Sequence, residues 1–215
     1  MTIETPRGTL EFAEEGHQYR LNGTVVPGVT TILSDEGLWY NPNANRGNAA
    51  LGTALHRGCR IVAEGKWDKS TTHPALVPRL EIFQQFLEKT DFKPLLWEQL
   101  VYSERYRYAG TFDLLGMRNG NYWLLDIKSN VPPQYADIQL ALYEQAARET
   151  GIIPLNMSVK RYTLALMEAR GNVRIPEKPG DSRSLALGLA AVQLWHFRRE
   201  KNLLRAEINF GEDTQ

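Results

Sequence analysis

The sequence predicts a mixed α/β (α+β) fold, in which a central mixed β-sheet is flanked by helices and preceded by an N-terminal β-hairpin. Two observations predict this class. Strand-like runs follow one another at residues 95–103, 108–117 and 121–129. Apolar residues recur at helical spacing before and after these runs, and a further strand-like run at 157–167 follows the next helical segment. This alternation is typical of one sheet packed against helices.

The N-terminal extension, at about residues 8–34, is predicted to hold a hairpin. Its short strands are expected at 9–13 and 17–26. Asn22-Gly23, inside the second run, is a signal for a two-residue turn. The run 29–33 fits either a short helix or a strand, and the Asn- and Gly-rich residues 34–48 favour a loop.

Helical periodicity predicts the helices that flank the sheet. They are expected at about residues 49–64, 74 or 75 to 89, 134–150 and 182–205. Asp181-Ser182 can cap the last of them. The core therefore spans about 49–205, and the whole chain 1–215 is predicted to form a single domain with its own hydrophobic core.

Composition excludes several classes of protein. Lys and Arg number 25, as do Asp and Glu, so the formal charge of zero gives no general attraction to nucleic acid or membrane. The single cysteine, Cys59, allows neither an intrachain disulfide nor a cysteine-based iron–sulfur cluster. The N-terminus lacks the features of a signal peptide, and no run of 18 apolar residues is present. We therefore expect a soluble cytoplasmic protein without a membrane partner.

The stretch WLLDIKSN, residues 123–130, places charge on a strand that otherwise looks buried. Asp126 and Lys128 are two positions apart, so their side chains share one face of the strand. A two-residue turn at Asn119-Gly120 would put Asp113 directly opposite Asp126, with Cβ atoms about 5 Å apart, and Thr111 opposite Lys128.

Two opposed carboxylates repel each other unless a positive charge lies between them. A hard divalent cation such as Mg²⁺ or Mn²⁺ would supply that charge, because it prefers oxygen ligands. Two alternatives stay open. Lys128 can neutralise the acids in a buried ion network, and a four-residue turn would shift the register.

Polar residues on two predicted helices are candidates for the same site. His56, in GTALH, can provide a third metal ligand, although a lone helical histidine is more often a surface or core residue. Gln139 and Tyr143 are one turn apart on one helix face and can contact phosphates or bases. The alternative for this pair is an ordinary amphipathic helix face.

Four motifs occur together in a characteristic order. They are GTALH (52–56), AGTFD (109–113), LLDIK (124–128) and QLALY (139–143). This series resembles the RecB-like branch of the PD-(D/E)xK nuclease superfamily, which has a restriction-endonuclease-like core. The resemblance covers about residues 52–143, and HQYRLNGTVVPGVTTIL is also similar to the leader of small phage-type exonucleases.

The resemblance implies roles for individual residues. The implied metal ligands are His56, Asp113, Asp126 and the backbone carbonyl of Ile127. The implied catalytic residues are Asp113, Asp126 and Lys128, with Lys128 orienting or activating the attacking water. Gln139 and Tyr143 would hold the DNA strand near a Mg²⁺ or Mn²⁺ ion.

Further charged residues are candidates on weaker grounds. Glu98 can be an additional or outer metal ligand, or simply an acid on the solvent side of an edge strand, and Glu81 is expected in solvent. The expected phosphate contacts are Arg57, Arg60, Arg105 and Arg107. The basic residues Arg198, Arg199, Lys201 and Arg205 can contact DNA or form a solvated helix end.

The function expected from the sequence is a Mg²⁺- or Mn²⁺-dependent deoxyribonuclease. An exonuclease of recombination, repair or phage DNA metabolism, in a bacterium or a phage-infected cell, is preferred over a structure-specific or restriction-type endonuclease. A catalytically silent DNA- or partner-binding module is the alternative from another class. No Walker A motif is present, so we expect no nucleotide cofactor, and a helicase would be a separate partner, as would a recombinase or a single-strand-binding protein. The oligomeric state is left open.

Overall fold

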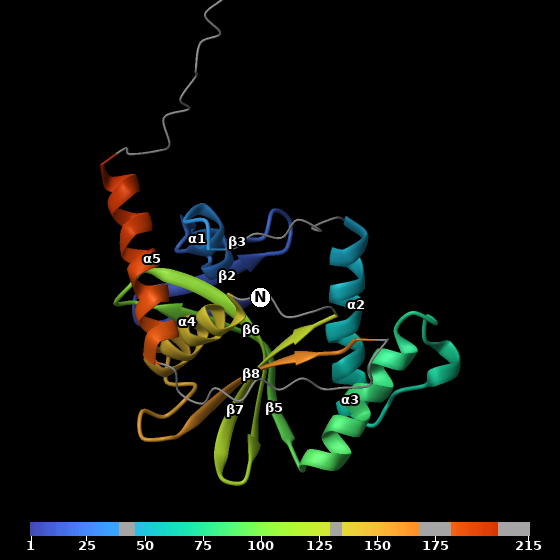
Figure 1. Cartoon of the computed structure of the whole chain (residues 1–215). Coiled ribbons are helices and arrows are strands. Elements are labelled where there is room, and N and C mark those ends of the chain that lie inside the picture. The colour runs from blue at the N-terminus through green and yellow to red at the C-terminus, as the bar shows by residue number, and fades with distance from the viewer. Residues whose placement is uncertain (39–45, 130–134, 168–181, 202–215) are drawn as a thin grey trace, which may run out of the picture.

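The computed structural model describes residues 1–38, 46–129, 135–167 and 182–201 and contains two four-stranded sheets (Figure 1). The mixed α/β class predicted from the sequence is confirmed. The strands of the first sheet are β1 (Thr2–Thr5), β2 (Gly8–Ala13), β3 (Gln18–Leu21) and β4 (Thr24–Val26). Those of the second are β5 (Lys93–Ser103), β6 (Tyr108–Arg118), β7 (Asn121–Lys128) and β8 (Val159–Ala165). The helices are α1 (Val29–Asp35), α2 (Arg46–Ala63), α3 (Val77–Thr90), α4 (Ala136–Glu149) and α5 (Ser182–Glu200), with a 3₁₀ turn at Lys69–Thr71.

The N-terminal sheet is an antiparallel meander in the order β1-β2-β3-β4. The predicted turn between β3 and β4 is confirmed, since Asn22 and Gly23 both have positive φ angles, of 49° and 78°. Strand β1 was not predicted, because its four residues are exposed or half-buried and show no apolar run. This sheet shares an apolar cluster with β5 and β6. The buried members of the cluster are Leu10, Tyr19, Leu100, Tyr102 and Ala109.

The main sheet has the order β5-β6-β7-β8. Strands β5, β6 and β7 are antiparallel neighbours, whereas β8 runs parallel to β7 after a crossover through α4. The sheet is therefore mixed, as predicted. A parallel pair requires a long crossover connection, and α4 provides it.

Helices cover both faces of the main sheet (Figure 1). Helices α2 and α3 pack on one face, through Leu55, Phe83 and the sheet residues Leu114 and Leu125. Helices α1, α4 and α5 pack on the other face, where Leu33, Leu140 and Val192 belong to one cluster with Phe112 and Leu124. The sheet thus lies between two apolar layers, and polar side chains are brought together where β6 and β7 stop pairing.

The predicted loop at 34–48 was too long. Ser34 and Asp35 belong to α1, and residues 46–48 belong to α2. Polar residues at helix ends escape a search for apolar spacing, because the end turns need not face the core. Residues 39–45 of this segment, the predicted start of α4 at residue 134 and the predicted end of α5 at 202–205 lie outside the described residues.

No helix in the described part of the chain is long and apolar enough to cross a bilayer.

Candidate functional site

The β6–β7 hairpin has the turn that the sequence predicted. Asn119 and Gly120 have φ angles of 49° and 73°, and Arg118 pairs with Asn121. From this turn the ladder continues without a shift to Leu114 opposite Leu125. The two-residue turn is therefore confirmed, and the four-residue alternative is wrong.

Beyond the pair Leu114–Leu125 the backbone pairing of β6 with β7 stops. Two residues further along β7, a backbone N–H donates its hydrogen bond to a side-chain carboxylate instead of to a backbone oxygen of β6. The backbone N–H of Ile127 donates to Asp113 Oδ2 at 2.7 Å. The register between β6 and β7 ends at Leu114–Leu125, so the predicted pairs Asp113–Asp126 and Thr111–Lys128 are not formed. The hydroxyl of Thr111 instead lies 3.2 Å from Tyr19 Oη of the N-terminal sheet.

Asp126 and Lys128 share one face of β7, as predicted from their spacing. Lys128 Nζ donates to Asp126 Oδ1 at 2.6 Å, and Asp126 is only 2% exposed. Burial raises the pKa of the Asp126 carboxyl to about 6, an effect that Lys128 reduces and Asp113 increases. Burial alone would lower the pKa of Lys128, but the carboxylates of Asp126 and Asp113 outweigh it and raise that pKa. The two acids and the lysine form one electrostatic unit.

His56 reaches this unit from helix α2, which lies far from β7 in the sequence. Its Nε2 atom lies 3.0 Å from the backbone oxygen of Ile127 and 3.6 Å from Asp113 Oδ2. Helix α2 positions it, because Leu55 and Cys59 on the buried side of the helix are completely enclosed by the core. The four groups that the sequence named as metal ligands thus converge at the end of β7.

Asp126 Oδ2 and Thr163 Oγ1, on the neighbouring strand, are buried and lack a hydrogen-bond partner in the described structure, as does Gln139 Oε1 on α4. Thr163 lies next to Asp126 in the parallel register between β7 and β8. Buried polar atoms are normally satisfied, so the Asp126 and Thr163 oxygens have spare capacity for a cation or a water molecule. Sequence reasoning missed Thr163; a polar residue within the apolar run RYTLALM was the available signal.

Gln139 and Tyr143 are adjacent on α4, as their spacing predicted. Gln139 Nε2 donates to Tyr143 Oη at 2.9 Å, and both residues are buried. The Tyr143 ring lies so close to β6 that a Cβ atom on Gly110 would come within 2.4 Å of it. The glycine of AGTFD is therefore needed for the close approach of α4 to the sheet. Burial raises the pKa of the Tyr143 hydroxyl well above its usual value.

The donor set suits a hard divalent cation in chemical type: two carboxylates, one imidazole and one carbonyl oxygen. The orphaned Oδ2 of buried Asp126 is an acceptor that such an ion would satisfy. However, no group of three or more His, Cys, Asp or Glu side chains within the described ranges is arranged to hold a metal ion. In this state Lys128 supplies the positive charge beside Asp126, and Mg²⁺ or Mn²⁺ binding stays a prediction.

Glu98 has an unusual backbone conformation. Its φ angle of 46° is left-handed, and it lies between the pairs Trp97–Leu114 and Gln99–Phe112, level with Asp113. A non-glycine residue in this conformation is strained. Its side chain is exposed. Both interpretations of Glu98, outer ligand and solvent-facing acid, agree with this position.

The predicted basic contacts differ in their surroundings. Arg57 and Arg60 are exposed on α2 beside His56, and Arg60 pairs with Glu64 at 3.2 Å. Arg105 and Arg107 are exposed in the β5–β6 turn. Among other charged residues named from the sequence, Glu81 pairs with Lys69 on the surface, as expected of a solvated acid.

The basic end of α5 is engaged with α1. Arg198 pairs with Glu36 at 2.8 Å, and Arg199 pairs with Asp35 at 3.4 Å. Arg199 also lies over the Trp195 ring, 4.0 Å from its centroid. These contacts favour a structural role for the two arginines over a DNA contact. Lys201 is exposed, and Arg205 lies outside the described residues.

Comparison with known proteins gives a distant structural likeness. No family model matches the chain, and no curated protein matches it. A crystal structure named "Putative exonuclease", from Eubacterium rectale, has a TM-score of 0.48 and 12% sequence identity, covering 85% of this chain and 77% of that one. A likeness this distant assigns no function.

Proposed function

We propose that this chain is a divalent-metal-dependent deoxyribonuclease of the PD-(D/E)xK type, acting as an exonuclease in DNA recombination, repair or phage DNA metabolism. One observation carries the proposal. At the end of β7, Lys128 Nζ, the Asp126 and Asp113 carboxylates, His56 Nε2 and the Ile127 carbonyl come together, with 2.6–3.6 Å between the partners that contact one another. A buried carboxylate in contact with a lysine, near a second carboxylate and an imidazole, has a clear use in phosphodiester hydrolysis.

The proposed roles follow from the contacts. His56, Asp113, Asp126 and the Ile127 carbonyl would hold Mg²⁺ or Mn²⁺, which supplies a Lewis acid for the phosphate and lowers the pKa of a nearby water. Lys128 is 29% exposed along its side chain, so its ammonium group can reach both Asp126 and an incoming phosphate. There it orients the water for in-line attack on phosphorus and offsets the charge that develops as the P–O bond breaks.

In this proposal Gln139 and Tyr143 do not touch the metal or the DNA, but hold α4 against the sheet. Their hydrogen bond and the packing of Tyr143 over Gly110 fix the distance between α4 and β6, the strand that carries Asp113. The burial of the Tyr143 ring means that DNA stacking on it requires α4 to move. We therefore assign the pair a positioning role in the described conformation.

The test is metal-dependent cleavage of linear duplex DNA by the purified protein. We expect cleavage with Mg²⁺ or Mn²⁺, none with EDTA, and a loss of at least about 10³-fold for Asp126→Asn and for Lys128→Ala. Lys93→Ala, which removes an exposed lysine of β5, is the matched control and should cleave normally. The proposal is wrong if the wild type shows no metal-dependent cleavage, or if both site variants cleave like it.

Substrate shape separates the exonuclease from the rival endonuclease. An exonuclease degrades linear DNA and leaves covalently closed circles intact, whereas an endonuclease cuts both. Binding without cleavage in every metal would identify the silent DNA-binding module instead.

A further inference from the structure

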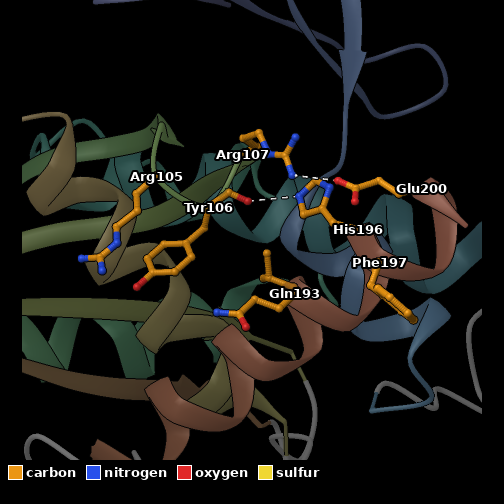
Figure 2. A pocket seen from close by; sticks show the side chains of 8 residues that line it. Arg105, Tyr106, Arg107, Gln193, His196, Phe197 and Glu200 are labelled. Carbon is orange, nitrogen blue, oxygen red and sulfur yellow. Dashed lines mark hydrogen bonds and ion pairs between the residues drawn. The ribbon is translucent and has the colours of Figure 1, made fainter.

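A pocket lies between the β5–β6 turn and α5 (Figure 2), and none of its lining residues belongs to the group of charged residues at the end of β7. It has a volume of about 370 Å³ and is partly open to solvent. Its principal lining residues are Arg105, Tyr106, Arg107, Gln193, His196 and Phe197. Pockets of this size accommodate small organic groups. Nothing in the proposed mechanism uses it.

The walls of the pocket are held in place by hydrogen bonds. A ring nitrogen of His196 lies 3.1 Å from the Tyr106 backbone oxygen, which ties α5 to the turn. Burial lowers the pKa of His196, and nearby Arg107 lowers it further, so the neutral ring is favoured. The turn is also attached to α4, since the backbone N–H of Arg105 donates to Glu149 at 3.2 Å. A ligand would meet a preformed surface.

Two arginine side chains that line the pocket are available to an anion. The Arg105 guanidinium lies over the Tyr106 ring, 5.3 Å from its centroid, and forms no ion pair with any residue that the structure describes. Arg107 contacts Glu200 at 3.4 Å, and both side chains are more than half exposed. An exposed ion pair of this kind contributes little to stability, so a phosphate can take the place of Glu200 beside Arg107 at a small cost in free energy.

The other side of the pocket offers an aromatic ring. Phe197 is 50% exposed and lies across the pocket from Arg105, with His196 and Gln193 between them (Figure 2). Exposed aromatic rings next to basic side chains are the usual elements of sites for single-stranded nucleic acid, in which bases stack and phosphates meet guanidinium groups. Because the Phe197 ring and the Arg105 guanidinium lie on opposite sides of the pocket, an extended ligand fits better than a compact anion (Figure 2).

We propose that this pocket binds a segment of single-stranded DNA, with a base stacked on Phe197 and backbone phosphates at Arg105 and Arg107. The inference rests on the proposed function, since it extends the DNA path of that enzyme. Strand β6 starts directly after Arg107 and carries Asp113 six residues further on, about 20 Å away along an extended strand. The pocket therefore holds the strand several nucleotides from the cleavage site and at a fixed distance from it.

The test measures binding of a fluorescein-labelled oligothymidylate of about 12 nucleotides by anisotropy, in EDTA so that no cleavage occurs. We expect about tenfold weaker binding for Phe197→Ala, through the lost stacking. Arg105→Ala should weaken binding several-fold and reduce the slope of log K against log salt by about 0.7, the value for one single-strand phosphate contact. Both side chains are exposed, so the unfolding temperature should stay the same.

Two controls match the variants. Leu187→Ala removes an apolar side chain that is 45% exposed on the same helix but outside the pocket, and Lys89→Ala removes an exposed cation of α3. Both should bind like the wild type. The inference is overturned if Phe197→Ala and Arg105→Ala also bind like the wild type, or if a duplex of equal length is bound as tightly as the single strand and loses affinity equally in these variants.

The two proposals fail separately. If the wild type cleaves DNA and the pocket variants bind normally, the nuclease stands and the pocket inference falls. If binding depends on Phe197 and Arg105 but no metal supports cleavage, the pocket inference stands and the nuclease falls.

Discussion

The two ends of the β6–β7 hairpin use the same pair of strands for different purposes. At the turn end, five consecutive pairs from Arg118–Asn121 to Leu114–Leu125 keep one register. Leu114, Leu124 and Leu125 are buried there against helices on both faces. At the open end the pairing stops, and the side chains that follow are Asp113, Asp126 and Lys128.

This difference shows how a sheet can carry a polar site. At the turn end the backbone N–H and C=O groups form hydrogen bonds between the two strands, and buried apolar side chains stabilise the fold. At the open end the N–H of Ile127 bonds to a carboxylate instead of a backbone carbonyl. That exchange holds Asp113 in place and directs charged groups into a buried space, at a cost in stability.

The largest effect should come from removing the ammonium group of Lys128 at the open end. Lys128→Met keeps the volume but leaves the carboxylates of Asp126 and Asp113 without their compensating charge. We expect cleavage to fall by about 10³-fold or more, and the metal-free protein to lose about 3–5 kcal/mol of unfolding free energy near neutral pH. Denaturant unfolding with and without Mn²⁺ measures the change in stability, and Mn²⁺ should restore part of it.

The stability loss of Lys128→Met should depend on pH. The pKa of Asp126 is raised from 3.8 to about 6, so the folded protein binds this proton more tightly than the unfolded chain does. The stability that this proton contributes is fully present below pH 4 and is lost as the pH rises through 6. Without Lys128 that pKa rises further, and protonation then removes the unpaired charge. The unfolding free energy lost in Lys128→Met should therefore be larger at pH 8 than at pH 5. Equal losses at the two pH values would show that Asp126 is not both buried and ionised at pH 8.

A substitution at the turn end should lower the stability of the protein without lowering its activity. Trp123→Ala removes a ring that contacts Tyr162 at 4.4 Å between centroids and lies under the guanidinium of Arg118. We expect a loss of about 3–5 kcal/mol in unfolding free energy, from the cavity and the lost ring contacts. Cleavage per folded molecule, measured below the unfolding transition, should stay close to that of the wild type. A large loss of specific activity would show that the two ends are not separable.

The smallest effect tests the turn. Gly120 has a φ of 73°, and a Cβ atom added there would meet open space, so Gly120→Ala changes only backbone strain. We expect a loss of about 1 kcal/mol. Gly52, on α2, also has free space but no positive φ, and Gly52→Ala should instead stabilise by up to about 1 kcal/mol through helix propensity. Thermal unfolding of both variants checks the opposite signs.

Local patterns were enough to predict most of the elements. Asn119-Gly120 fixed the turn, because few residues accept two successive positive φ angles, and the turn fixed the register as far as Leu114 and Leu125. The spacing of Asp126 and Lys128 placed them on one face for the same reason, since strand periodicity is local. The four ordered motifs then indicated which polar residues to place together.

The sequence by itself therefore determined helices α2 to α5, the main strands, one register and the candidate residues, but left α1 open between a helix and a strand. Only the tertiary structure decided that His56 reaches the Ile127 carbonyl, that Thr163 lies beside Asp126, and that Tyr143 is buried against Gly110. It also decided that Arg198 and Arg199 form ion pairs with Glu36 and Asp35 at the end of α1, and that exposed Phe197 lines the same pocket as Arg105. The physical reason is one of range: periodicity and turn chemistry act over a few residues, whereas shared burial and pairing of polar groups depend on packing between segments far apart in the chain.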